Sequence, residues 1–176
     1  MDEAANVERW TALSKDDAGL QKEIEALLTA HAVGDPYNSD GSFAKTLATL
    51  PLGLRAMAAT HWLDISLTLD SITWHFGNFG EPHLVAETEA GLIELGLHDL
   101  ASCFREAKEL MLPLLAQRTE AEDDFDEFLE QKGVRQLADD LNGRAWSLDN
   151  LGPGKSLIYD AWIQYARRHP ELVFDI

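Results

Sequence analysis

The chain has 176 residues, enough for one compact domain with a sizeable core, and its 45% of apolar residues excludes an intrinsically disordered protein. Its 31 acidic residues outnumber its 14 basic residues, which gives a formal net charge of -17. This charge repels phosphate groups, so it argues against direct binding to nucleic acid or to anionic membranes and favours a basic protein partner.

The N-terminal segment is acidic and lacks the basic-then-apolar pattern of a signal peptide. No apolar run approaches the roughly 20 residues needed to span a bilayer, so we expect a cytoplasmic protein. Cys103 is the only cysteine, which excludes an internal disulfide and a thiolate metal cluster. Its place on the apolar side of a helical pattern predicts a buried side chain rather than a reactive thiol.

Helical periodicity runs through the first half of the chain. A helix is expected between Asp16 and Gly34, followed by a turn-rich loop over residues 34–42. A short helix should end before Pro51. Residues 52–76 are mostly apolar and predict one or two buried central helices, in which the aromatic residues of the segment form core.

Helices alternate with short breaks in the second half. The segment GNFGEP at residues 77–82 should interrupt the central run, with Pro82 in the first turn of the next helix and Gly96 at that helix's end. Another helix should end near Pro113. A later one should stop before Asn142-Gly143, and the last should contain Trp162, with the apolar tail docked on the body.

These patterns predict an all-α fold with one acidic domain over residues 1–176. The expected architecture is a bundle of roughly seven to nine helices around a buried central helix pair. Repeats and low-complexity segments are absent from the sequence. A homodimer would be compatible with this architecture, since symmetry can extend an acidic face across two copies.

The segment TEAEDDFDEFLEQK, residues 119–132, is the most unusual stretch, since seven of its fourteen residues are carboxylates. Thr119 with Glu122 has the spacing of a capping box at a helix start. At helical spacing, Ala121, Phe125, Phe128 and Leu129 share one apolar face, which leaves the acids on the outer face.

Like charges this close destabilise a helix, so we attribute them to function rather than to stability. Residues 120–149 hold ten acids, Asp149 among them, and only three bases. The candidate partner-binding residues are the seven acids of the stretch, supported by two acids further on: Glu120, Glu122, Asp123, Asp124, Asp126, Glu127, Glu130, Asp139 and Asp140.

Helix geometry suggests what such a face can imitate. Side chains four residues apart on a helix are separated by about 6 Å along its axis. This spacing is close to that of successive phosphates along a DNA strand. Lysine and arginine side chains pair with carboxylates as they do with phosphate oxygens, so an acidic helix face can occupy a DNA-binding protein.

Other chemistries find less support in the sequence. The segment GPGKS at residues 152–156 resembles the end of a phosphate-binding loop, but it lacks the first glycine of that motif and is expected to be a turn before a helix. His61 and His75 lie among aromatic residues and are expected to be part-buried and hydrogen-bonded. Nucleophile and dinucleotide-binding motifs are missing, so we expect no enzyme activity, no catalytic residues and no cofactor.

Residues 70–107 resemble the uncharacterised domain family found in a bacterial acidic DNA-mimic protein. An aromatic-rich stretch ends in an asparagine and a turn glycine, and two helices follow. The matching residues are Trp74, Phe76, Asn78 and Gly80, then Leu95-Gly96 and Leu100-Ala101. The resemblance implies an all-α fold and, by analogy with the DNA-mimic member, mimicry. It implies no particular functional residue.

The leading hypothesis is therefore a non-enzymatic acidic protein that regulates or blocks a basic, DNA-binding protein through a DNA-like carboxylate surface. One alternative is an immunity protein that neutralises a cognate toxin, since it would have the same size and acidity. The other is a metal-binding helical-bundle enzyme. Its candidate ligands are two pairs at helical spacing, His61 with Asp64 and His83 with Glu87, although no metal ligand is assigned.

Overall fold

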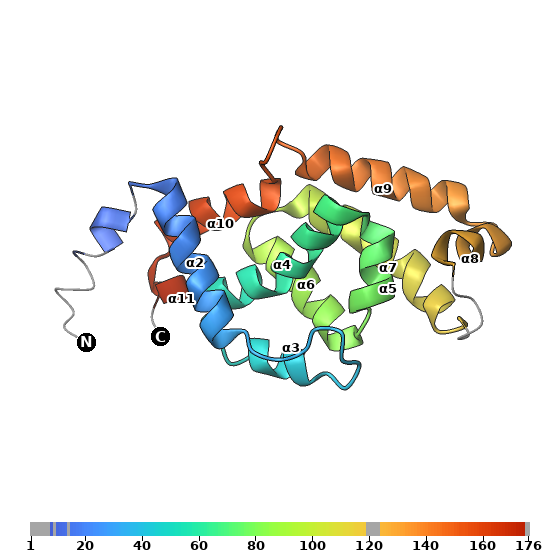
Figure 1. The fold of residues 1–176 in the computed structure, drawn as a ribbon, viewed down its shortest axis with the longest axis horizontal. Helices are drawn as coiled ribbons and strands as arrows, with labels where there is room; N and C mark the ends of the chain where they lie inside the picture. The colour runs from blue at the N-terminus through green and yellow to red at the C-terminus, as the bar shows by residue number, and fades with distance from the viewer. Residues whose placement is uncertain (1–7, 9, 14, 119–123, 175–176) are drawn as a thin grey trace.

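The computed structural model describes residues 8, 10–13, 15–118 and 124–174 (Figure 1). Within these ranges the chain is all-α, as predicted, and the only β-type pairing is one isolated bridge between Asn150 and Ser156. The helices are α2 (Asp17–His31), α3 (Ser42–Leu47), α4 (Leu52–Leu69), α5 (Ile72–Phe79), α6 (Pro82–Glu94), α7 (His98–Leu115), α8 (Phe125–Gln131), α9 (Arg135–Asp149), α10 (Leu157–Arg168) and α11 (Glu171–Phe174).

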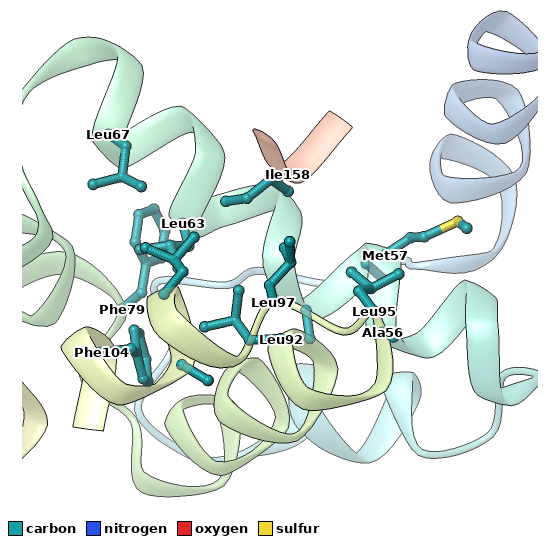
Figure 2. Packing of buried hydrophobic residues seen from close by; sticks show 14 of the residues in the cluster. Ala56, Met57, Leu63, Leu67, Phe79, Leu92, Leu95, Leu97, Phe104 and Ile158 are labelled. Carbon is teal, nitrogen blue, oxygen red and sulfur yellow. The ribbon is translucent and has the colours of Figure 1, made fainter. Parts of the chain in front are cut away.

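Helix α4 is the buried centre of the bundle, as the continuous apolar run predicted. Of its 18 residues, 11 are buried, and they point in all directions around the helix axis. A helix that is apolar on every side requires neighbours on every side. Helices α2, α3, α5, α6, α9, α10 and α11 supply them. Figure 2 shows Leu63 of α4 beside Phe79, Leu92 and Phe104, which come from α5, α6 and α7.

The most extensive helix pairing is that of α4 with α6, and it depends on a glycine. A Cβ atom added at Gly91 would lie 2.9 Å from the carbonyl oxygen of Ala56, so only glycine permits this approach. The Arg55 guanidinium clamps the same pair by donating to both carboxylate oxygens of Glu87, at 2.6 and 2.5 Å. The exposed face of the pair is therefore tied by a bidentate ion pair.

The C-terminal helices close the bundle over α4. The fully buried indole of Trp162 donates its Nε1 hydrogen to Thr60 Oγ1 at 3.0 Å. Val173 in α11 is also fully buried, and α11 packs on α4, so the apolar tail docks on the body as predicted for the residues described. The Trp162 side chain fills part of the core, and its one polar atom is hydrogen-bonded. It therefore anchors α10 at this position.

The predicted break over residues 77–82 is shorter than expected, because only Gly80 and Glu81 separate α5 from α6. Helix α5 continues through Gly77 and Asn78 to Phe79, and the Asn78 side chain donates to the carbonyl of Trp74 at 3.0 Å. Phe79 is 1% exposed, and the extra turn is what places its ring in the core. Packing of this one aromatic residue therefore outweighs the low helix propensity of Gly and Asn.

The predicted helix end before the Asn142-Gly143 pair is wrong, because both residues lie inside α9. Asn142 Oδ1 accepts hydrogen bonds from the backbone nitrogen of Thr73 at 3.1 Å and from its hydroxyl at 3.0 Å. The asparagine thus satisfies the first turn of α5 rather than forming a turn of its own. Helix α7 likewise extends two residues past Pro113, to Leu115.

Other predictions hold. Gly96 adopts a positive φ angle at the end of α6, and Pro82 occupies the first turn of that helix. Cys103 is fully buried, with its sulfur 3.6 Å from the carbonyl oxygen of Leu141. In the part of the chain that the structure describes, no helix combines the length and the apolar character required to cross a membrane.

Candidate functional site

Helix α8 carries the centre of the acidic stretch, but it begins later than the capping-box pattern predicted. Its N-cap is Asp124, whose Oδ1 accepts the backbone N–H of Glu127 at 3.0 Å. A carboxylate in this position also meets the positive end of the helix dipole. The predicted pair, Thr119 and Glu122, lies outside the described residues.

Asp124 therefore has a structural role in addition to its charge. Replacing it with alanine should destabilise α8 locally by about 1 kcal/mol, because the N–H of Glu127 loses its acceptor. Amide hydrogen exchange in residues 125–131 should rise several-fold, while exchange in α4 stays as in the parent protein. Asp124→Ser, which can still cap, serves as the control and should leave the protection of α8 nearly intact.

The apolar face of α8 fixes which way its acids point. Phe128 and Leu129 are buried and Phe125 is half-buried, as the periodicity predicted. Gly133, with a φ of 69°, then reverses the chain, and the Val134 N–H donates to the Leu129 carbonyl at 3.1 Å. This turn brings the start of α9 against α8 at one end of the molecule (Figure 1).

The outer side of this corner is what we call the acid surface. It consists of the six predicted acids that fall within the described residues, and all six are exposed: Asp124, Asp126, Glu127, Glu130, Asp139 and Asp140. The other three predicted residues, Glu120, Glu122 and Asp123, lie outside the described residues. The fold thus brings the two separate predicted acid groups, one on each helix, onto one surface.

Arg135 fixes the spacing of this surface by bridging the two helices. Its Nη1 lies 2.6 Å from Asp126 Oδ1 on α8, and its Nε lies 3.2 Å from Asp139 Oδ1 on α9. These carboxylates, Asp126 first, raise the pKa of the Arg135 guanidinium above its ordinary value. Because all three side chains are solvent-exposed, the bridge contributes more to geometry than to stability.

The acid surface also contains features that charge counting missed. Lys132 Nζ lies 5.4 Å above the Phe128 ring, and the Arg118 guanidinium lies 5.5 Å from the centre of the Phe125 ring. Both cations therefore sit on the aromatic residues at the edge of the surface. Arg118 lies seven residues before Phe125 in the chain. Sequence spacing alone did not predict that these two side chains are in contact.

Asp149 does not belong to the acid surface, contrary to its inclusion in the acid count. It is 6% exposed, and its Oδ1 accepts the backbone N–H of Ile158 at 3.2 Å. Burial raises the pKa of this carboxyl, and the backbone hydrogen bonds oppose that rise. Asp149 therefore organises the start of α10 rather than a surface. The nearby GPGKS segment forms the predicted turn, and Ser156 caps α10 through the Tyr159 N–H at 3.0 Å.

His61 is part-buried, as predicted, but its Nδ1 has no hydrogen-bond partner within the described chain. His75 is more buried than predicted: it is fully buried, with Nδ1 2.9 Å from Ser66 Oγ and no partner for Nε2 within the described chain. Burial lowers its pKa to about 3, so the ring is neutral at pH 7. Of the candidate metal ligands, Glu87 is engaged by Arg55, and the described residues contain no group of three or more potential ligands.

Together these features define an all-α protein with an acidic surface at one end. The model of the DMP19-like protein family matches residues 48–169, which is more than half of the chain. The chain belongs to the DMP19-like protein family. The match encloses residues 70–107, on which the resemblance rested, and also α8 and α9.

No curated protein matches the chain, and no solved structure matches it either.

Proposed function

We propose that this protein is a non-enzymatic binding protein that occupies the DNA-binding surface of a basic protein partner and thereby regulates or blocks it. The observation that carries the proposal is the acid surface, in which six exposed carboxylates on two helices project from a braced corner. Arg135 joins two of the six carboxylates, Asp126 and Asp139, across the two helices, and this defined placement supports mimicry more than charge alone does.

Membership of the DMP19-like family adds a second line of support, since residues 70–107 resemble the domain family of a bacterial DNA mimic. The net charge of -17 adds a third. Such a field attracts a basic partner over distances comparable to the Debye length and repels DNA itself. The proposed complex is accordingly one in which the acid surface and duplex DNA compete for the same lysine and arginine side chains.

A pull-down from the native host's lysate, read by mass spectrometry at low and at high salt, tests the proposal. We expect a DNA-binding protein to be retained at low salt, lost at high salt and displaced by added duplex DNA. A toxin domain that survives high salt would favour the immunity alternative instead. If nothing is retained at either salt concentration, the acid surface serves solubility and the proposal is wrong.

A further inference from the structure

A concave site that includes no residue of the acid surface is lined by residues of α2, α3, α4 and α10. Its volume is about 390 Å³, within the range of pockets that hold small molecules. The side chains that give it chemical character are Glu25, Phe43, His61, Trp62 and Tyr159. Trp62 packs against the core, as predicted for the aromatic residues of this segment, and it also lines the pocket together with His61.

The walls of the pocket are aromatic and are held by packing behind them. The Trp62 ring lies 5.3 Å from the His61 ring and 6.4 Å from the Phe43 ring, measured between centroids. Opposite, Tyr159 packs at 4.6 Å on the fully buried Trp162. A site whose walls are fixed before binding loses little conformational entropy when a ligand enters.

The pocket is electronegative. Glu25 is exposed at its rim, and no lysine or arginine is among its described lining residues. Asp64, one helical turn from His61, is 4% exposed and has an Oδ1 without a partner in the described chain. Burial, followed by the charges of Asp64 and Glu25, raises the pKa of Tyr159 to about 12. The faces of the aromatic rings carry partial negative charge, which adds to the negative potential of the pocket.

His61 adds no positive charge to the pocket. Burial lowers the pKa of its imidazole, and the nearby Glu25 only partly opposes this effect, so the ring is neutral at pH 7. A neutral imidazole does not repel a cationic ligand.

We propose that this pocket binds the ammonium or guanidinium group of an organic cation. In this arrangement the alkyl part of the cation lies against Phe43 and Trp62, and its charged end meets Glu25 and the aromatic faces. Aromatic walls combined with a single carboxylate at the rim favour this class of ligand over anions and over neutral molecules. The same chemistry is carried by free alkylamines and alkylguanidines and by lysine or arginine side chains.

Isothermal titration with n-butylguanidinium and n-butylammonium tests the proposal, with n-butylurea as the neutral molecule of matched shape. We expect both cations to bind and the urea to bind at least tenfold more weakly, because it lacks the charge that the aromatic faces attract. The urea comparison uses the unmodified protein and so does not depend on the folding of a variant. Equal binding of all three molecules, or of none, overturns the proposal.

The variant Glu25→Gln keeps the shape of the side chain and removes its charge. We expect the affinity for n-butylguanidinium to fall about tenfold, the size of one lost charge-assisted contact. Glu130→Gln on the acid surface removes the same charge at the other site and should leave cation binding unchanged. If Glu25→Gln binds as tightly as the parent, the assignment of the carboxylate is wrong.

The source of the cation is decided by a second ligand pair. N-acetyl-arginine methylamide carries the side chain on a peptide backbone, whereas n-butylguanidinium is a free alkylguanidine with the same single charge. Equal binding of the two indicates a site for a partner's side chain, and binding of n-butylguanidinium alone indicates a site for a small molecule. Because the proposed acid surface lies elsewhere, Glu25→Gln should leave capture of the DNA-binding partner intact, so the two proposals fail separately.

Discussion

Neutralising four carboxylates of the acid surface should weaken binding to the DNA-binding partner about 100-fold at low salt, since each exposed ion pair contributes up to about 1 kcal/mol. The substitutions are Asp126→Asn, Glu127→Gln, Glu130→Gln and Asp140→Asn. They leave the helix cap Asp124 in place, and Arg135 keeps Asp139 as a partner. The thermal unfolding midpoint should therefore move by only a few degrees.

The measurement is the dissociation constant of the partner recovered in the pull-down, determined over a series of salt concentrations. The quadruple variant should show a flatter salt dependence as well as a weaker affinity, because fewer charges are paired on binding. A matched control removes four exposed acids from other parts of the chain: Asp35, Asp99, Asp160 and Glu171. If this control weakens binding as much as the quadruple variant does, net charge rather than the acid surface is responsible.

Helix positions could be predicted from the sequence wherever local chemistry determined them. Asp16 caps α2 through the Ala18 N–H at 3.2 Å, and Pro82 and Gly96 mark the ends of α6. The predictions failed where a distant residue changed the local preference. Asn142 is 69 residues from Thr73 in the chain, yet it caps α5 and so remains helical itself. Turn propensity cannot anticipate such a contact.

In the acid surface, too, local features could be predicted from the sequence and features that depend on distant contacts could not. Its exposed residues followed from helical periodicity, because the buried positions Phe128 and Leu129 leave the acids on the opposite face. The bridge through Arg135 and the burial of Asp149 did not follow, since both depend on how α8, α9 and α10 meet. Charge counting treats all acids alike, whereas the fold separates exposed carboxylates from buried ones that serve as backbone acceptors.

Replacing the buried Asp64 with asparagine should stabilise the protein at neutral pH and have little effect in acid. Burial is the main cause that raises the pKa of Asp64 from 3.8 to about 6; the hydroxyl of Ser156 opposes this, and the charge of Asp149 adds to it. The carboxyl is 4% exposed, and its Oδ1 has no partner in the described chain. Ionising it in the folded protein is therefore costly.

The sign of the pH dependence follows from the raised folded-state pKa. Below pH 3.8 the group is protonated in both states, and between 3.8 and about 6 the folded state holds the proton more tightly, so the free energy of unfolding falls as the pH rises. Above pH 6 the loss is complete and amounts to about 2 to 3 kcal/mol. The Asp64→Asn variant would carry no such loss, because its amide has no charge to bury.

Urea unfolding of the parent and of Asp64→Asn at several pH values between 4 and 8 measures this difference. We expect the variant to gain about 2 kcal/mol over the parent between the acidic and the neutral end of the series. The self-repulsion of a chain with 31 acids also changes with pH, but it affects both proteins and so cancels in the comparison. Asp160→Asn removes the same charge at an exposed position of α10 and is the control for the loss of one charge. If the free energies of unfolding of the parent and of Asp64→Asn differ by the same amount at every pH, the Asp64 carboxylate is not destabilising when ionised. That result would contradict the prediction.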